Sequence, residues 1–511
     1  MNIICTRPAR LTLLLLALAA PLLAGNVVRA GSTQEPQHMD PARVWDDTSS
    51  FYVHNIFDTL VRLDPGTMKL EPSLAVSWQT SPDGRTWTFQ LRRGVRFHDG
   101  TPFDADAVVF TFSRQMAPAA SDRAGDFPLF SEIFTYLKAV RKVGPHQVQF
   151  ILSEPFFPFL ASLTVDCAAI VSPTAVKKSG AAFTYRPVGT GPYKLGSWQR
   201  NKRLVLTANA NYWRGKPGID EYIDTIEPQA EMLSKYFQDG ILDILSTYSI
   251  SKMVSYRKQD WVQVVAVPLY SVTYVVLNAA RPALKNRAVR QALCHAWDPR
   301  ALTLVFQDYV LPIHSLLPPG LAGGAAGAPP LGFSLAKAQA LLKKDGAKPD
   351  IQLEMLMLRD DGLLYQLLSI YARNLKQAGV RLKFTRLDSD EYARRVTSGD
   401  YDLAYSGWIA DYPDPDSMLF PQFSDKLRQQ GLANSAGSGS QDLLQLLTRT
   451  RRESDAGKRQ AAYREIDRAL VGDGLVLPLY QDKRVVIFNR KLANVRPDPL
   501  GKLSLYNLRM K

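Results

Sequence analysis

The chain is poor in cysteine and, after its first two dozen residues, has no long apolar run. Only 3 of its 511 residues are Cys, which excludes a small domain held together by disulfides. No later stretch approaches the roughly 18 apolar residues of a membrane-spanning helix. With 46% hydrophobic and 22% charged residues the composition excludes disorder, and the length predicts about three structural units.

The motifs of common enzymes are also absent. The sequence contains no phosphate loop ending in Gly-Lys-Ser or Gly-Lys-Thr, no Gly-x-Ser-x-Gly and no His-Glu-x-x-His, and its 6 His are scattered. The triplet Gly189-Thr190-Gly191 is similar to part of a phosphate cradle, but Pro192 follows it and has no backbone N–H to donate. We therefore predict a tight turn there, and neither catalysis nor a cofactor.

Lysine and arginine outnumber aspartate and glutamate by 62 to 48, which gives a formal charge of +14. Such an excess raises the question of a nucleic acid or an acidic membrane surface. The basic residues are spread along the chain, however, and the densest groups, at 92–96 and 449–452, are short and have acidic neighbours. The pattern favours a solvated basic surface and no nucleic-acid partner.

Residues 1–24 have the layout of a secretory signal peptide. Two arginines precede an apolar run at 11–24 that is too short for a certain membrane span. Cleavage is expected near Ala24 or Gly25, with a site after Ala30 as the alternative. No cysteine follows the apolar run at the position of a lipid anchor. We therefore expect a soluble periplasmic protein.

The mature chain keeps two cysteines in a compartment that permits disulfides. Cys167 lies in an apolar segment at 163–171, and Cys294 lies in a helical pattern at 287–297. Each is typical of a small buried hydrophobic residue. Two free, packed thiols are the preferred interpretation. A disulfide between them is the alternative, and it would require the two segments to meet.

The first half of the chain is rich in strand and turn signals. Trp87, Phe89 and Leu91 alternate after a Ser-Pro-Asp-Gly turn, which predicts a half-buried strand. One clear helix follows, where Asp104 precedes an apolar run at 108–112 and can accept a hydrogen bond from the first turn. This half is therefore expected to consist mainly of strands.

In the second half, strands alternate with helices. Asn286 and Ser334 each stand at the start of an amphipathic pattern, as helix caps do. Further on, a buried strand at 351–358, a helix at 363–378 ended by a glycine, and a strand at 380–387 follow one another. Such a succession predicts parallel strands covered by helices, so the fold class is α/β.

The densest acidic cluster is the loop Trp408-Ile409-Ala410-Asp411-Tyr412-Pro413-Asp414-Pro415-Asp416. A calcium loop of the EF-hand type needs alternating oxygen ligands and a glycine, and the prolines here argue against one. A glycosidase needs two carboxylates that face each other across a sugar, which one local loop does not show. A ligand contact is the preferred interpretation, a structural turn is the alternative, and no metal ligand is assigned.

Several stretches act together as a signature. They are Met39-Asp40-Pro41, Leu74-Ala75-Val76-Ser77-Trp78, Leu91-Arg92-Arg93-Gly94-Val95-Arg96-Phe97-His98-Asp99-Gly100, Val188-Gly189-Thr190-Gly191-Pro192-Tyr193, Val289-Arg290-Gln291-Ala292-Leu293 and the loop at 408–416. In this order and spacing they resemble the family 5 extracellular solute-binding proteins of ABC importers, which include periplasmic dipeptide-, oligopeptide- and nickel-binding proteins. The likeness covers nearly the whole mature chain.

The resemblance implies a two-lobed periplasmic binding protein (type II, cluster C-like) with a hinge and an extra subdomain in its N-terminal lobe. By analogy, residues 25–268 and 478–511 form lobe I, which includes the extra subdomain at about 43–170. Residues 269–477 form lobe II. The ligand is enclosed between the lobes, and only a ligand that contacts both of them favours closure.

The resemblance also implies site residues. In peptide-binding relatives the acid of the Trp-x-x-Asp loop takes the ligand's α-ammonium group, and Asp411 occupies that place. Dipeptide binders use an arginine after the 351–358 strand for the ligand's carboxylate, and Arg359 stands there, with a surface arginine as the alternative. Trp45 and Asp46 stand where relatives run main chain beside the peptide. The extra acids at this place favour a cationic ligand.

Trp408, Tyr405 and Tyr274 are candidates for the walls of the pocket, with a place in the core as the alternative for each. The expected ligand is a di- or oligopeptide, and the expected partner is an ABC permease in the inner membrane. The binding protein itself is expected to be a monomer. A binder of nickel or a metal chelate on the same fold is the main alternative, although no histidine lies close to Trp408 in sequence. An exported hydrolase that uses the acidic loop is a further alternative.

Overall fold

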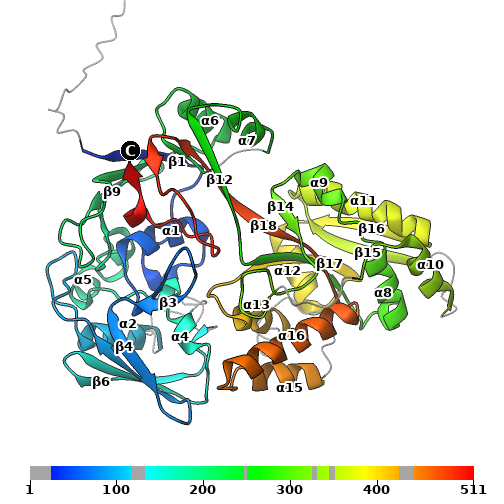
Figure 1. The fold of residues 1–511 in the computed structure, drawn as a ribbon, viewed down its shortest axis with the longest axis horizontal. Coiled ribbons are helices and arrows are strands. Elements are labelled where there is room, and N and C mark those ends of the chain that lie inside the picture. The colour runs from blue at the N-terminus through cyan, green and yellow to red at the C-terminus, as the bar shows by residue number, and fades with distance from the viewer. Residues whose placement is uncertain are drawn as a thin grey trace, which may run out of the picture.

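The computed structural model describes residues 25–116, 130, 133–246, 250–324, 331–344, 351–424 and 441–511. It consists of two mixed α/β bodies that lie side by side and are joined by long strands (Figure 1). The predicted signal peptide lies outside the described residues. Within the described ranges, no helix is both long and apolar enough to cross a membrane.

The first body holds one part of a large sheet. Its strands lie in the order β8 (Tyr193–Gln199), β9 (Arg203–Ala208), β10 (Glu221–Ile226), β1 (Val27–Ser32) and β11 (Ile244–Leu245). β1 is parallel to both β10 and β11. The carboxyl ends of these three strands therefore meet at one edge of the sheet, and this is the edge at which open α/β sheets bind ligands.

Helices surround this part of the sheet, and the first of them was not expected from the sequence. α1 begins after Asp46, whose Oδ1 accepts a hydrogen bond from the N–H of Ser49 at 2.8 Å, as a helix cap does. This cap therefore fixes the direction in which the chain passes from the preceding loop into α1. The helices of this part are α1 (Asp47–Ile56), α5 (Pro173–Ser179), α6 (Ala230–Gln238) and α7 (Ile250–Tyr256), while the short α4 (Phe159–Ser162) packs on the smaller sheet described next.

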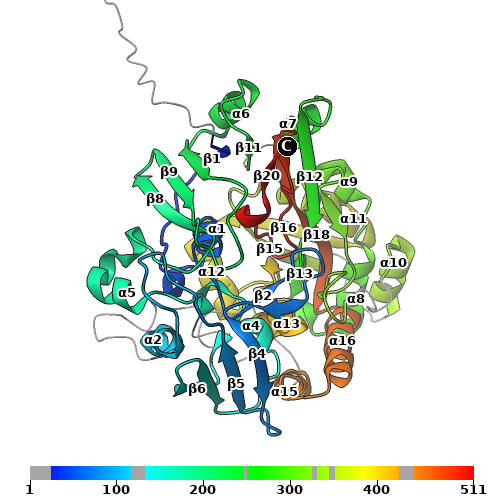
Figure 2. The same cartoon turned by 60° about the vertical axis from the view of Figure 1, so that its left-hand side comes forward.

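A second, antiparallel sheet belongs to the first body. Its strands lie in the order β4 (Ala75–Thr80), β5 (Thr86–Leu91), β7 (Gln147–Leu152) and β6 (Leu137–Gly144). Helix α2 (Ala105–Met116) packs against it, with the rings of Phe112 and Phe150 4.8 Å apart (Figure 2). Asp104 accepts a hydrogen bond from the N–H of Ala107 at 3.2 Å. The predicted strand at Trp87 and the predicted helix are therefore confirmed, while the subdomain bounds at 43–170 stay a prediction.

The second body holds the rest of the large sheet. Its strands lie in the order β16 (Val380–Leu387), β15 (Ile351–Leu358), β17 (Leu403–Ile409), β13 (Ser271–Leu277) and β18 (Val476–Asn489). β15 and β16 are parallel and are connected by α11 (Gly362–Ala378), so the predicted strand-helix-strand unit is confirmed. Gly379 ends α11 with a φ of 98°, a conformation that glycine adopts without strain.

Two predicted helix caps of the second body are also confirmed. The N–H of Ala288 donates to Asn286 at 2.9 Å, and the N–H of Lys337 donates to Ser334 at 3.2 Å. These residues start α8 and α10. The helices of this body are α8 (Arg287–His295), α9 (Ala301–Phe306), α10 (Leu335–Lys344), α11, α12 (Ser389–Ser398), α13 (Pro415–Phe423), α15 (Gln441–Thr450) and α16 (Ala456–Gly472).

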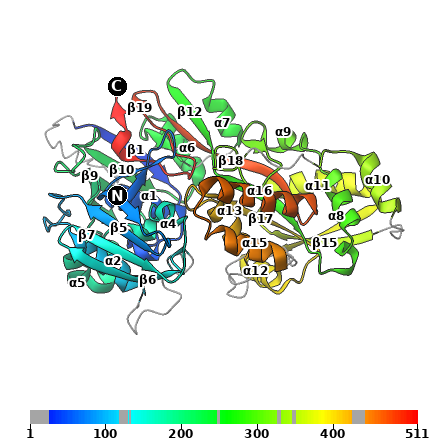
Figure 3. The same cartoon turned by 60° about the horizontal axis from the view of Figure 1, so that its bottom comes forward.

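The two bodies are linked by β18 and by the turn from β12 (Val262–Pro268) into β13. The first half of β18 pairs with β13, and its second half pairs with β12 and β11, so a single strand runs through both bodies (Figure 3). Between the halves, the N–H of Leu269 donates to the carbonyl of Asp482 at 2.9 Å. The predicted lobe boundaries, at 268 and 477, stay a prediction, and this crossover lies beside them.

The two cysteines of the mature chain lie in the core. Cys167 and Cys294 are both buried and free, so the interpretation as packed thiols is confirmed and the disulfide alternative is excluded. Burial raises the pKa of the Cys294 thiol to about 12. The remaining short strands either pair with β18, as β14 (Val310–Pro312) does, or form the two-stranded sheets of β2 (Val61–Leu63) with β3 (Leu70–Pro72) and of β19 (Leu492–Ala493) with β20 (Arg509–Met510).

Candidate functional site

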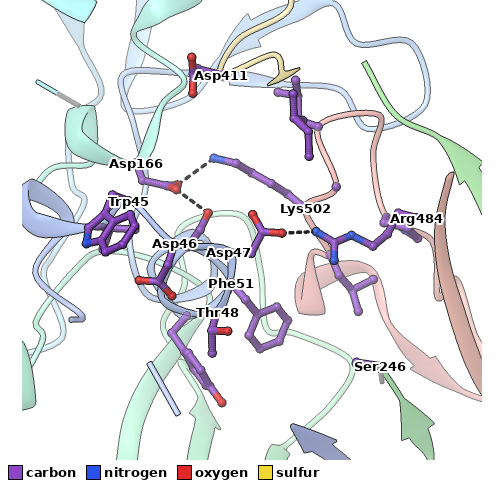
Figure 4. A pocket seen from close by; sticks show the side chains of 18 of the residues that line it. Trp45, Asp46, Asp47, Thr48, Phe51, Asp166, Ser246, Asp411, Arg484 and Lys502 are labelled. Atoms are coloured by element: carbon purple, nitrogen blue, oxygen red, sulfur yellow. Dashed lines mark hydrogen bonds and ion pairs between the residues drawn. The ribbon is translucent and has the colours of Figure 1, made fainter. Parts of the chain in front are cut away.

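A cavity of about 500 Å³ lies where the two bodies meet the C-terminal segment (Figure 4). We call it the central cavity. The first body contributes the start of α1 and the carboxyl edge of β1, β10 and β11. The second body contributes the end of β17 and the loop after it, and the C-terminal part of the chain contributes β18 and the loop before β20. Such a volume is typical of sites for small ligands. The main lining residues used below are Ser32, Trp45, Asp46, Asp47, Ser50, Tyr52, Asp166, Asp224, Ser246, Trp408, Ile409, Asp411, Arg484 and Lys502.

Four of the seven predicted site residues line the central cavity. Trp45 and Asp46 come from the loop before α1, and Trp408 and Asp411 come from the end of β17 and the loop after it. Trp45 is 65% exposed although it is large and apolar, and Ile409, which also lines the cavity, is 39% exposed. Exposed apolar side chains contributed by both bodies are typical of a surface that a ligand covers.

The other three predicted residues do not line the central cavity. Tyr274 is completely buried in the core, where its hydroxyl donates to Gln422. In the register of β13 and β17, Val275 rather than Tyr274 lies opposite Tyr405, which is half-buried. Arg359 is exposed at the end of β15. Alternation along a strand places neighbouring side chains on opposite faces, so aromatic residues near a site in sequence can point away from it.

Asp411 lies at the junction of the two bodies and forms no ion pair with any residue that the structure describes. Its N–H donates to Ser417 Oγ at 2.7 Å, and that hydroxyl lies 3.4 Å from its Oδ2. Burial raises the pKa of the Asp411 carboxyl to about 7, and this outweighs the lowering by Lys502 and by the Ser417 hydrogen bond, while Asp166 raises the pKa further. The side chain is therefore a desolvated carboxyl at the cavity wall that a ligand's cation would stabilise.

The other two aspartates of the acidic loop are structural. Asp414 caps α13 by accepting a hydrogen bond from the N–H of Asp416 at 3.0 Å. Asp416 is fully buried and pairs with Arg451 Nε at 2.9 Å, while the hydroxyls of Tyr412 and Tyr463 donate to it at 2.8 Å. Of the three acids, only Asp411 reaches the central cavity. Among the described residues, no group of three or more His, Cys, Asp or Glu is arranged to hold a metal ion.

The two cations of the cavity wall are already paired with aspartates. Lys502 Nζ lies 2.8 Å from Asp166, whose other oxygen accepts a hydrogen bond from Ser50. Arg484 lies 2.6 Å from Asp47 (Figure 4). Among the described residues the cavity therefore presents five aspartates against two cations, so the unpaired charge of this part of its wall is negative.

The glycine triplet, predicted as a tight turn, packs closely against the end of α1. The N–H of Gly191 donates to the carbonyl of Ile56 at 2.9 Å. A Cβ atom at Gly191 would lie only 2.5 Å from the carbonyl carbon of Ile56, so only glycine allows the two backbones to approach this closely. The triplet lies behind α1, outside the central cavity, and holds in place the helix whose start lines it.

Comparison with known proteins shows which proteins this chain resembles in sequence and structure. The sequence model of the family of bacterial extracellular solute-binding proteins, family 5, matches residues 69–429 of this chain. The chain is 27% identical to a dipeptide-binding protein of Escherichia coli strain K12, over 98% of this chain and 97% of that one. It superposes on HbpA2 from Haemophilus parasuis with a TM-score of 0.86 and 25% identity, over 95% and 100% of the two chains.

A further solved structure contains a ligand. This is the ABC transporter-associated periplasmic binding protein DppA from Helicobacter pylori in complex with the peptide STSA. The TM-score is 0.77 at 25% identity, and the match covers 95% of this chain and 98% of that one. The α/β, two-lobed fold expected from the sequence is therefore confirmed.

Proposed function

The chain belongs to the family 5 bacterial extracellular solute-binding proteins, and we propose that it captures di- or oligopeptides in the central cavity for delivery to the permease of an ABC importer. Asp411 carries the proposal. A carboxylate that is buried without a cation costs free energy, and a peptide's α-ammonium group offsets that cost when it binds there. The dipeptide-binding protein of E. coli and the STSA complex support a peptide as the ligand.

The walls of the cavity have separate roles in this proposal. Trp45 and Trp408 supply apolar surface to the peptide, and the loop at Asp46 offers main chain on the first body. Asp411 lies on the second body. A peptide bound between them contacts both bodies at once, which is the condition for a ligand to favour the closed form.

Several further properties belong to the proposal. Residues 25–268 and 478–511 form one lobe and residues 269–477 the other, and they close about the crossover between β12, β13 and β18. The protein acts in the periplasm as a monomer after removal of residues 1–24. It binds and releases its ligand without chemical change and without a cofactor.

Calorimetric titration of Asp411→Asn with two matched peptides tests the proposal. For a tripeptide with a free amine we expect binding at least roughly tenfold weaker than wild type, or about 1.4 kcal/mol. The N-acetylated form of the same tripeptide has no ammonium group and should bind both proteins equally. Asp239→Asn, which changes an exposed aspartate paired with Lys235 outside the cavity, is the control. Equal losses of affinity for both peptides would refute the assignment of Asp411 to the ligand's ammonium group.

A further inference from the structure

Asp224 is a buried carboxyl in the wall of the central cavity that the proposed function does not use. It lies on β10, is only 1% exposed and lines the cavity. Its Oδ2 accepts hydrogen bonds from Ser32 Oγ at 2.7 Å and from the hydroxyl of Tyr52. Its Oδ1 has no hydrogen-bond partner among the described residues. One oxygen of the carboxyl is therefore anchored, and the other is buried without a hydrogen bond from the described residues.

No lysine or arginine of the described ranges forms an ion pair with Asp224. Burial raises the pKa of its carboxyl to about 6, and the hydrogen bonds from Tyr52 and Ser32 only partly oppose this. At neutral pH the group is mainly ionised. A buried carboxylate in this state costs free energy unless a cation reaches it. Since Arg484 and Lys502 are held by Asp47 and Asp166, neither cation of the cavity is free to do so.

Asp224 and Asp411 enter the cavity from different bodies. Asp224 lies on β10 of the first body, and Asp411 lies in the loop after β17 of the second body. A ligand that contacts both bodies therefore meets an acid from each of them.

We propose that Asp224 forms a second cation subsite, which takes the basic side chain of a peptide whose α-ammonium group lies at Asp411. The inference rests on the proposed function and narrows the substrate class to peptides that contain lysine, ornithine or arginine. The charge balance supports it. After the two ion pairs are set aside, Asp46, Asp224 and Asp411 remain, and a neutral dipeptide supplies only one cation to them. A basic peptide supplies two.

Matched peptides test this directly, because norleucine has the straight side chain of lysine without its ammonium group. The panel is Lys-Ala against Nle-Ala and Ala-Lys against Ala-Nle, titrated at pH 7.5 into the full mature chain. In wild type we expect the lysine peptide of at least one pair to bind tenfold tighter or more. In Asp224→Asn this ratio should fall below threefold, while the norleucine peptide keeps its wild-type affinity within threefold.

The controls separate the possible results. Asp46→Asn and Asp411→Asn should each keep the lysine-to-norleucine ratio, although the second weakens every free peptide. If Asp224→Asn does not fold, as judged by circular dichroism, a ratio that persists in these two variants still supports the subsite. Loss of the ratio in Asp46→Asn overturns it. Equal binding of lysine and norleucine peptides by wild type also overturns it and leaves the proposed function intact, whereas failure of all four peptides to bind overturns the proposed function.

Discussion

Peptide affinity should fall as the pH drops below 7, because the proposed ammonium site is ionised only in part at neutral pH. Burial holds the pKa of Asp411 at about 7 in the empty protein, and a bound ammonium group keeps the carboxylate ionised. Below pH 7 a proton must leave before the ligand binds. The prediction concerns a peptide with apolar side chains, so that the titration of Asp224 does not contribute.

The magnitude follows from the ionised fraction of Asp411. With a pKa of about 7, half of the carboxyl is ionised at pH 7 and about one hundredth at pH 5. The apparent affinity should therefore fall roughly 50-fold between these two values, or about 2.3 kcal/mol. The ligand-free protein responds in the opposite sense. A folded-state pKa above the unfolded value means that the folded form binds the proton more tightly, so the contribution of Asp411 to the free energy of unfolding rises as the pH falls from about 7 to about 4.

Isothermal titration calorimetry at pH 7, 6 and 5 measures this dependence. Repeating the pH 7 titration in two buffers of different ionisation enthalpy counts the protons released, and about half a proton per peptide is expected. In Asp411→Asn both the pH dependence and the proton release should disappear. A wild-type affinity that changes by less than threefold across this window, or an asparagine variant with the same slope as wild type, would refute the reasoning.

Two further predictions concern stability. Gly191→Ala should lower the free energy of unfolding by about 1–3 kcal/mol, because the new Cβ would lie 2.5 Å from the carbonyl carbon of Ile56. The control Gly362→Ala, whose Cβ would have no atom within 4 Å, should be neutral. Equal melting temperatures for both variants would contradict the packing role of Gly191. Arg451→Met should lower the free energy of unfolding, measured by chemical denaturation, by about 3–5 kcal/mol, because it leaves the buried carboxylate of Asp416 without its cation. Arg452→Met, which changes a partly exposed arginine, should lower it by less than about 1 kcal/mol. Similar losses for both variants would show that burial of the ion pair does not matter.

Local signals account for what the sequence predicted well. The unit β15-α11-β16 was expected within one residue, since its strands are apolar runs and its helix ends at a glycine in the left-handed conformation. The cap residues Asn286 and Ser334 were also found, because a cap acts on N–H groups only two or three positions away. Such features depend on neighbours in sequence and need no knowledge of the tertiary fold.

The rest of the site depends on contacts between distant segments. Lys502 and Asp166 are 336 positions apart, and no local pattern indicates that they meet. Asp224 stands in a strand where alternation gives no sign that its buried face opens into a cavity. Tyr274 is the opposite case, because it was proposed for the wall of the pocket and lies in the core. The sequence therefore pointed to Trp45, Asp46, Trp408 and Asp411, which line the cavity, but not to the charged groups Asp166, Asp224, Arg484 and Lys502 on its wall.

In the proposed function, the position of Asp411 also bears on how a bound ligand stabilises this arrangement of the two bodies. The bodies touch away from the β18 crossover, where the N–H of Phe157 donates to the carbonyl of Arg451 at 3.1 Å and the guanidinium of Arg451 lies 4.5 Å from the ring centroid of Phe156. These contacts involve no ligand. The rise in the pKa of Asp411 from 3.8 to about 7 corresponds to a few kcal/mol against ionisation in this arrangement, which is the order of the difference between two conformations of a protein that a ligand can shift. One carboxylate therefore opposes this arrangement while the cavity is empty and, once it meets an ammonium group, no longer does.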